Sequence, residues 1–175
     1  MTSQLERIRR RLTERGVELN PPVSLEAVLA FESRHAITLP EGYRRFITEL
    51  GDGGPGPIDY GILPLEELPS DLRPDETVVW AELADVTKAF PFTKPLVWED
   101  GDESDEGGEE QLSWGTIRLG TDGCGMYWHL IITGPDRGIP WMICGEGIQP
   151  VCPKRPFLDW YEDWLDGRGS FYGYR

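Results

Sequence analysis

The chain has 175 residues, a net charge of −14 at pH 7 and a sequence pI of about 4.5. Hydrophobic residues make up 39% of it and aromatic residues 11%, which suits one globular domain and argues against global disorder. No apolar run approaches the ~20 residues of a membrane helix, no secretory signal is present, and an acidic surface repels phosphate backbones. We therefore expect a cytoplasmic protein that binds neither membranes nor nucleic acid.

The first 22 residues predict an arginine-rich helix and a linker. Apolar residues recur every three or four positions, and the pattern stops at Gly16, a residue suited to a helix C-terminus. This sparse apolar stripe consists of Leu5, Ile8 and Leu12. Asn20, Pro21 and Pro22 then form the linker, because consecutive prolines cannot continue a helix.

Two more helices are predicted before residue 51. Ser24 is a good N-cap, and the helix after it places Leu25, Val28, Leu29 and Glu32 on one face. The next helix begins at Pro40, whose fixed φ and missing N–H suit a first helical position. Its apolar stripe consists of Tyr43, Phe46, Ile47 and Leu50. The glycines that we expect to end it are Gly51, Gly53, Gly54 and Gly56.

The second half of the chain predicts strands and a closing helix. A short apolar segment covers residues 60–65, and residues 77–83 could form either a strand or a helix. Residues 115–119, 126–133 and 139–144 predict strands, the last two joined as a hairpin by the turn at residues 134–138. An amphipathic helix with Gly167 as its C-cap is predicted from Phe157, Trp160, Tyr161, Trp164 and Leu165.

The order of these motifs resembles the SMI1/KNR4 family of the SUKH superfamily. Its members share a Leu-Pro-x-x-Tyr/Phe-x-x-Phe helix, an Asn/Asp-Gly-Gly stop and a Gly-x-x-Pro-Leu strand. The matching residues here are Leu39, Pro40, Tyr43 and Phe46, then Asp52, Gly53 and Gly54, then Gly61, Pro64 and Leu65. A Leu-Gly strand end and Gly-rich turn follow at residues 119–125, and the closing aromatic helix also fits.

This resemblance implies an α+β fold: a single domain with a mostly antiparallel central sheet, N-terminal helices and a C-terminal helix packed around it. We expect residues 1–22 to be the N-terminal helix and linker, 23–167 the SMI1/KNR4-like domain, and 168–175 a C-terminal tail. The arginine-rich helix and the length of the acidic run at Glu99–Glu110 depart from the family pattern.

Eight of the twelve residues from Glu99 to Glu110 are acidic, and none is apolar. This composition is typical of a solvated surface loop, and it also suits electrostatic docking of a basic protein. An EF-hand is rejected, because a loop that starts at Asp102 has Ser113 at position 12 and no flanking helices; weak divalent binding stays open.

Other site chemistry is weakly supported. Gly51, Gly53 and Gly56 spell G-x-G-x-x-G, but they follow a helix and not a strand, so a dinucleotide site is excluded. The three cysteines lack paired C-x-x-C spacing, so we expect reduced, buried thiols without zinc. A nucleophile built from Cys124 with His35 or His129 is disfavoured, since negative surroundings raise a thiol pKa. We expect no enzyme activity, no cofactor and no metal.

The resemblance implies a binding module, and for many bacterial members an immunity protein that neutralises a cognate toxin, often a nuclease. An acidic inhibitor suits a basic toxin domain. Two alternatives stay open: a regulatory or scaffold protein, as implied by the fungal members, and a metal-dependent hydrolase. Tyr127 and Trp128 are adjacent and face opposite sides of a strand, so one of them could be an exposed hot spot. The residues that we expect to contact the partner are Asp52, Glu99, Asp100, Asp102, Glu103, Asp105, Glu106, Glu109, Glu110 and Trp128.

Overall fold

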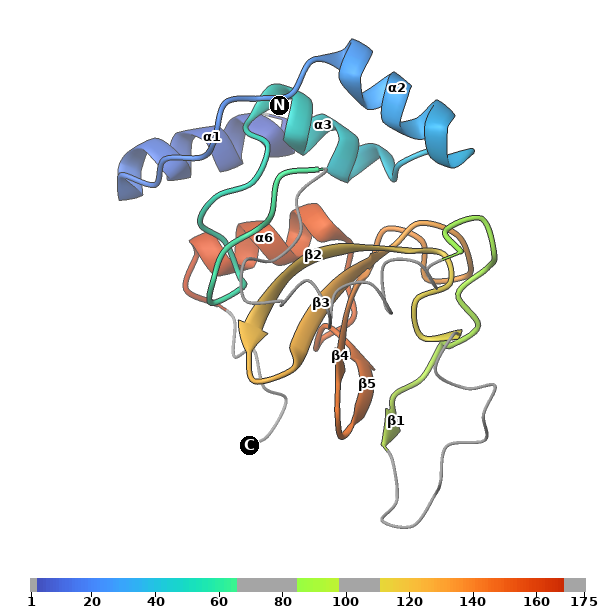
Figure 1. The fold of residues 1–175 in the computed structure, drawn as a ribbon. Helices are drawn as coiled ribbons and strands as arrows, with labels where there is room; N and C mark the ends of the chain where they lie inside the picture. Colours follow the sequence, from blue (N-terminus) through green and yellow to red (C-terminus); the bar gives the residue numbers. More distant parts are fainter. Residues whose placement is uncertain (1–2, 66–84, 98–110, 169–175) are drawn as a thin grey trace.

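The computed structural model describes residues 3–65, 85–97 and 111–168, which form four helices and a five-stranded sheet (Figure 1). In chain order the elements are α1 (Gln4–Arg15), α2 (Leu25–His35), α3 (Glu41–Glu49), β1 (Leu96–Val97), β2 (Thr116–Gly123), β3 (Met126–Ile131), β4 (Pro140–Cys144), β5 (Gly147–Pro150) and α6 (Phe157–Leu165). None of the described helices is both long enough and apolar enough to span a bilayer.

The sheet is antiparallel, with strand order β1-β5-β4-β3-β2. The α+β fold with a mostly antiparallel sheet is therefore confirmed, as is the hairpin of β3 with β4. Strands β1 and β5 were not predicted, and they are only two and four residues long. The predicted segment at residues 60–65 lies along the outer edge of β2, where the Leu63 N–H donates to the Leu119 carbonyl oxygen at 2.8 Å.

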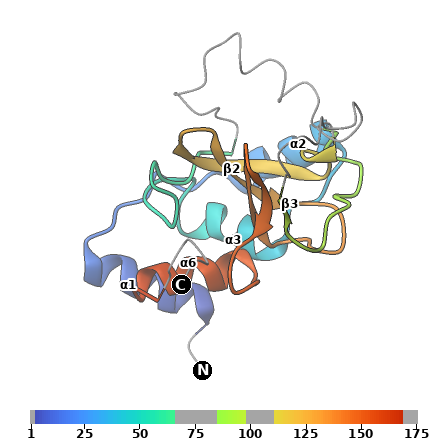
Figure 2. The ribbon, with the colours of Figure 1, turned by 90° about the horizontal axis from the view of Figure 1, so that it is seen from below.

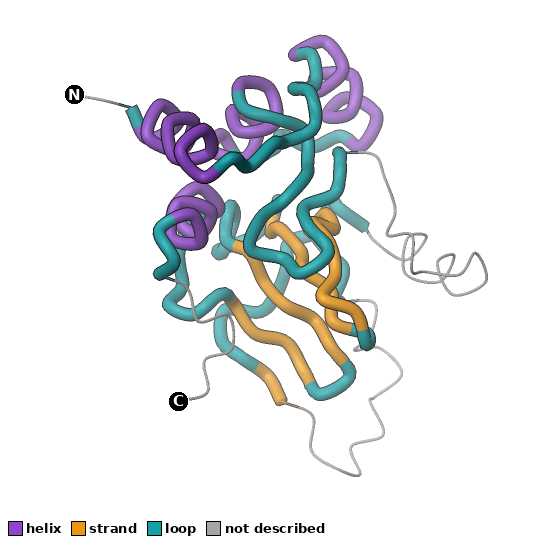
Figure 3. Tube along the Cα trace, turned by 90° about the vertical axis from the view of Figure 1, so that its left-hand side faces the viewer, coloured by secondary structure: helices purple, strands orange, loops and turns teal. Residues whose placement is uncertain are grey.

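The main core fills the space between the helices and one face of the sheet, and the helices gather on one side of the strands in Figure 3. Aromatic rings form its centre. The centre of the Phe46 ring on α3 lies 5.2 Å from that of Phe157 and 4.7 Å from that of Tyr161, both on α6. Leu130 and Met142 extend this core from β3 and β4. The predicted stripe of the closing helix is thus confirmed as core except at Trp164, which is only partly buried.

A second, smaller core covers the opposite face. Trp141 follows the sheet alternation and points away from Met142, into a cluster with Phe90 at a ring distance of 5.0 Å. Phe90 comes from the irregular segment 85–97 and is fully buried. Its backbone N–H donates to the Thr133 carbonyl oxygen at 2.8 Å, which fixes this segment against the end of β3.

Helix α1 is part of the core, and its arginines are engaged within the molecule. The helix packs beside α6, as seen from below in Figure 2. Arg7 pairs with Glu162 at 2.8 Å and lowers the pKa of that carboxyl by hydrogen bonding. Arg11 pairs with Asp166, and Arg15 donates to the Leu165 carbonyl oxygen at 2.7 Å. The arginine-rich sequence therefore locks two helices together.

The face that α2 buries differs from the predicted one. Ser24 caps the helix as expected, accepting from the Ala27 N–H at 3.1 Å. Val28 is fully buried, but Leu25 and Leu29 are 56% and 50% exposed. The buried face is instead centred on Val28, Phe31 and Glu32, because the Glu32 carboxylate turns inward and accepts from the Leu39 N–H at 2.7 Å.

The glycines after α3 serve two different purposes. The helix begins at Glu41, one residue later than predicted, because Pro40 is its N-cap and not its first helical residue; it ends at Glu49. Gly53 and Gly54 have φ of +88° and +117°, which L residues rarely adopt. Gly51 is required by close approach instead, since a Cβ there would lie 2.4 Å from the Leu19 Cβ.

Candidate functional site

The negative charge of the chain is concentrated outside the described fold. The described residues contain 17 acidic and 15 basic side chains, a net charge of only −2. Residues 66–84 contain six acidic residues and one basic residue, and residues 98–110 contain eight acidic residues and no basic one. We call these two stretches the acidic segments. The predicted acidic surface is therefore a property of two segments and not of the whole molecule.

The first acidic segment leaves the fold at Leu65, and Asp52 holds that point. The Asp52 Oδ1 atom accepts from the Leu65 N–H at 3.0 Å, and its carbonyl oxygen accepts from the Asn20 side-chain amide at 3.1 Å. Asp52 is half-buried. The structure thus gives Asp52, one of the predicted contact residues, a clear positioning role at the start of this segment.

The first described residues after the two acidic segments lie at the same corner, next to Gly115. The Gly115 N–H donates to the Asp85 carbonyl oxygen at 3.0 Å, and the Trp114 N–H donates to the Gln111 carbonyl oxygen at 3.4 Å. The Lys88 ammonium lies 4.5 Å from the centre of the Trp114 ring. Residues 85 and 111 are the first described residues after the two acidic segments.

Gly115 is essential to this junction, because its φ is +61° and a Cβ would lie 2.5 Å from the carbonyl oxygens of both Lys88 and Thr133. Asp85 is itself fixed locally: the Thr87 hydroxyl donates to its carboxylate at 2.6 Å and lowers the pKa of that group. The corner is therefore a rigid attachment for the flanking chain.

The second acidic segment leaves from β1, the outermost strand on one side of the sheet. Leu96 and Val97 pair with Ile148 and Gly147 of β5, and their side chains are 41% and 67% exposed. The predicted contact residues of this segment lie outside the described residues: Glu99, Asp100, Asp102, Glu103, Asp105, Glu106, Glu109 and Glu110.

Trp128 is buried, which corrects the expectation of an exposed hot spot at this residue. Its side chain is 2% exposed, its ring lies 5.1 Å from the Trp160 ring, and its Nε1–H donates to Asp122 Oδ2 at 2.7 Å. Tyr127 faces the other side of β3 and is half-buried, with the Arg118 guanidinium 4.7 Å from its ring centre. Burial on the helix-covered face removes Trp128 from any contact surface in this conformation.

The exposed aromatic residue that the sequence reasoning missed is Tyr60, whose side chain is 74% exposed. It lies at the tip of a turn beside the β2–β3 hairpin, where the Asp59 N–H donates to Asp122 Oδ1 at 2.8 Å and the Tyr60 ring lies over Gly123. The available signal was its position in a Pro-Ile-Asp-Tyr-Gly stretch, which is typical of a turn and not of a buried strand.

The described residues do not form a nucleophilic site. His129 is buried, and burial together with nearby Arg118 lowers its pKa to about 3. Its Nδ1 lies 3.0 Å from the Thr116 hydroxyl, which donates to the Ser113 carbonyl oxygen and so accepts the Nδ1 proton.

The thiols differ from their expected burial. Cys124 and Cys152 are exposed, Cys144 is half-buried, and all three are free. Within the described ranges no three His, Cys, Asp or Glu side chains are grouped closely enough to hold a metal ion. The structure therefore offers neither a thiol–imidazole pair nor a metal cluster in the described part of the chain.

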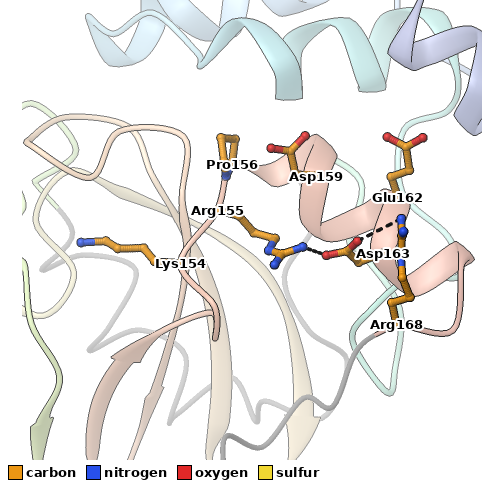
Figure 4. Close-up of a pocket in the computed structure, with 7 residues that line it drawn as sticks. All are labelled: Lys154, Arg155, Pro156, Asp159, Glu162, Asp163 and Arg168. Atoms are coloured by element: carbon orange, nitrogen blue, oxygen red, sulfur yellow. Dashed lines mark ion pairs between the residues drawn. The ribbon is translucent and has the colours of Figure 1, made fainter.

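A polar hollow of about 460 Å³ lies beside α6, but its charges neutralise one another. Figure 4 shows Arg155 and Arg168 both directed at Asp163, with which each forms an ion pair. Lys154 points away from them and pairs with buried Asp136 at 2.5 Å. The hollow is thus a network of internal ion pairs and has no unpaired basic side chain to receive an anion.

Comparison with known proteins identifies the family. The family model of the SMI1 / KNR4 family (SUKH-1) matches residues 22–154. No curated protein and no solved structure matches the chain. The family is generally one of non-catalytic binding proteins. Because the match covers about three quarters of the sequence and includes the helix, glycine stop and strands described above, this chain belongs to the SMI1/KNR4 (SUKH-1) family.

Proposed function

We propose that this protein is an immunity protein, which binds and neutralises a cognate bacterial toxin domain without catalysis. The observation that carries the proposal is the uneven distribution of charge along the chain. The described residues have a net charge of only −2, whereas the two acidic segments contain 14 acidic residues. The described residues that follow these two segments meet at one corner, next to Gly115. Family membership supports a binding role.

A nuclease toxin is the partner class that this charge suits. A nuclease must bind phosphate, so its active face is basic, and an acidic inhibitor is attracted to that face over a long range. The described residues supply little of that field, since their acidic and basic side chains nearly cancel. The acidic segments therefore supply the attraction, and the rigid corner holds their ends.

The test begins with the product of a neighbouring toxin gene, co-purified with this chain and then used in stopped-flow association measurements. Charge steering predicts an on-rate that falls at least about tenfold between low and high salt, because ions screen the attraction. An on-rate that is insensitive to salt would refute the charge-based mechanism. Capture of a cellular regulatory protein, with no binding to the toxin, would refute the immunity role and favour a scaffold protein.

A matched pair of variants separates the acidic segment from overall charge. One variant replaces Asp102, Glu103, Asp105 and Glu106 by their amides. The control replaces four exposed acidic residues of the fold by glutamine: Glu14, Glu18, Glu26 and Glu146. Both variants lose four negative charges, and we expect the first to slow association about tenfold and the second by less than about twofold. Equal slowing would contradict a localised docking role.

A further inference from the structure

Tyr60 is presented to solvent by a tight turn that is anchored on both sides. The Gly61 N–H donates to the Ile58 carbonyl oxygen at 2.8 Å and closes the turn, which leaves Asp59 and Tyr60 at its tip. Ile58 and Ile62 are buried, with 2% and 3% exposure, whereas the Tyr60 side chain is 74% exposed. The core thus holds the base of the turn and leaves the tyrosine outside.

The turn is fixed against the β2–β3 hairpin by Asp122. One carboxylate oxygen accepts from the Asp59 N–H at 2.8 Å, and the other accepts from Trp128 Nε1–H at 2.7 Å. The Tyr60 ring lies over Gly123, where a Cβ would be 3.1 Å from the tyrosine Cε2. A ring held in this way loses little conformational freedom when a partner binds.

Among the described residues, the carboxylates of Asp59 and Asp122 have no cationic partner. No described Lys or Arg side chain forms an ion pair with Asp59 or Asp122, and none lies over the Tyr60 ring. Tyr127 on β3 differs from Tyr60, because the Arg118 guanidinium lies 4.7 Å from the centre of the Tyr127 ring. Tyr60 is therefore an exposed aromatic ring that follows Asp59 in the chain and lies over Gly123, the residue after Asp122, and no described cation covers it.

We propose that Asp59, Tyr60 and Asp122 form a recognition site for an arginine side chain of a basic protein partner. A guanidinium group stacks on an aromatic face and donates in its own plane to carboxylates, so it satisfies both features at once. The site rests on the proposed function and deepens it, because it adds a rigid contact within the fold to the long-range attraction of the acidic segments.

The site is tested on the full chain with two probes, the peptide acetyl-Gly-Arg-Gly-amide and its citrulline counterpart, which has nearly the same shape but no charge. In a ¹⁵N NMR titration, the arginine peptide shifts the amide signals of Asp59, Gly61 and Gly123, and the citrulline peptide does not. Tyr60→Leu weakens this binding two- to fivefold, the factor that corresponds to about 0.5–1 kcal/mol for an exposed cation–π contact.

Asp59→Asn also weakens the binding of the arginine peptide. The matched control is Glu146→Gln, at an exposed acidic residue of the β4–β5 turn, and it leaves the binding unchanged. Tyr60 and Asp59 are exposed, so these variants keep the fold, which the remaining amide signals verify. Equal shifts with citrulline, no shift at the turn, or unchanged affinity in Tyr60→Leu would overturn the proposal.

The same variants separate this site from the proposed function. If the toxin binds the wild type and Tyr60→Leu equally well, the arginine site is wrong and the immunity role stands. If the toxin does not bind the wild type, the immunity role fails, and the peptide titration still decides whether the turn recognises arginine.

Discussion

Buried His129 makes the stability of this protein depend on pH in a calculable way. Burial lowers the pKa of its imidazole from 6.5 to about 3 in the folded protein. Between these two values the unfolded chain binds a proton that the folded protein does not, so acidification favours unfolding. The stabilisation is fully present above pH 6.5 and is lost progressively as the pH falls toward 3.

The magnitude follows from this difference in proton binding. Between pH 7.5 and pH 5.5, His129 alone removes about 1.4 kcal/mol from the free energy of unfolding. This figure depends little on the folded-state value, because any folded pKa below about 4.5 leaves the imidazole neutral at pH 5.5.

The assay is urea unfolding of the wild type and His129→Gln at both pH values, followed by tryptophan fluorescence. The glutamine amide can still donate to the Thr116 hydroxyl, but it does not titrate. We expect the wild type to lose about 1.4 kcal/mol more than the variant between the two pH values. His35→Gln removes the only other histidine and serves as the control. Equal losses in the wild type and in His129→Gln would show that His129 does not titrate between the folded and unfolded states in this way.

Four further substitutions test the packing. In urea unfolding, Val28→Ala should lower the free energy of unfolding by about 2 kcal/mol and Leu29→Ala by less than about 0.5 kcal/mol, because only Val28 is buried. Similar losses in the two variants would contradict the assigned buried face of α2. Trp128→Phe should cost about 2 kcal/mol through the lost hydrogen bond to Asp122, and a neutral result would contradict its burial. Gly115→Ala should cost about 3 kcal/mol by thermal or urea unfolding, since the new Cβ meets two carbonyl oxygens; unchanged stability would contradict the tight corner.

Elements with a strong local period could be predicted from the sequence. The aromatic stripe of α6 and the stop of α1 at Gly16 both follow from spacing and backbone preferences that act within a few residues. Strands β1 and β5 are too short to show a period; β5 pairs with β4 as a hairpin, whereas β1 exists because Leu96 pairs with Ile148, far along the sequence. Such a pairing is a property of the folded chain.

The sequence also could not predict which of Tyr127 and Trp128 is exposed, because this depends on contacts between distant parts of the chain. Alternation places Tyr127 and Trp128 on opposite faces of β3, but only the packing of Trp128 on Trp160 of α6 decides which face is covered. Likewise, Leu25 and Leu29 have helical spacing, yet the inward turn of the Glu32 carboxylate rotates the buried face away from them. The acidic run was evident from composition alone, whereas the rigid corner at Gly115 required the structure.

The proposed immunity role requires that this chain neutralise a toxin by binding it stoichiometrically. It is tested by titrating the purified protein into a candidate toxin, taken from a neighbouring gene, and following the residual activity of that toxin. We expect a linear fall to zero at one equivalent, with inhibition weakened by high salt. Full toxin activity in the presence of excess protein, at low salt, would contradict it.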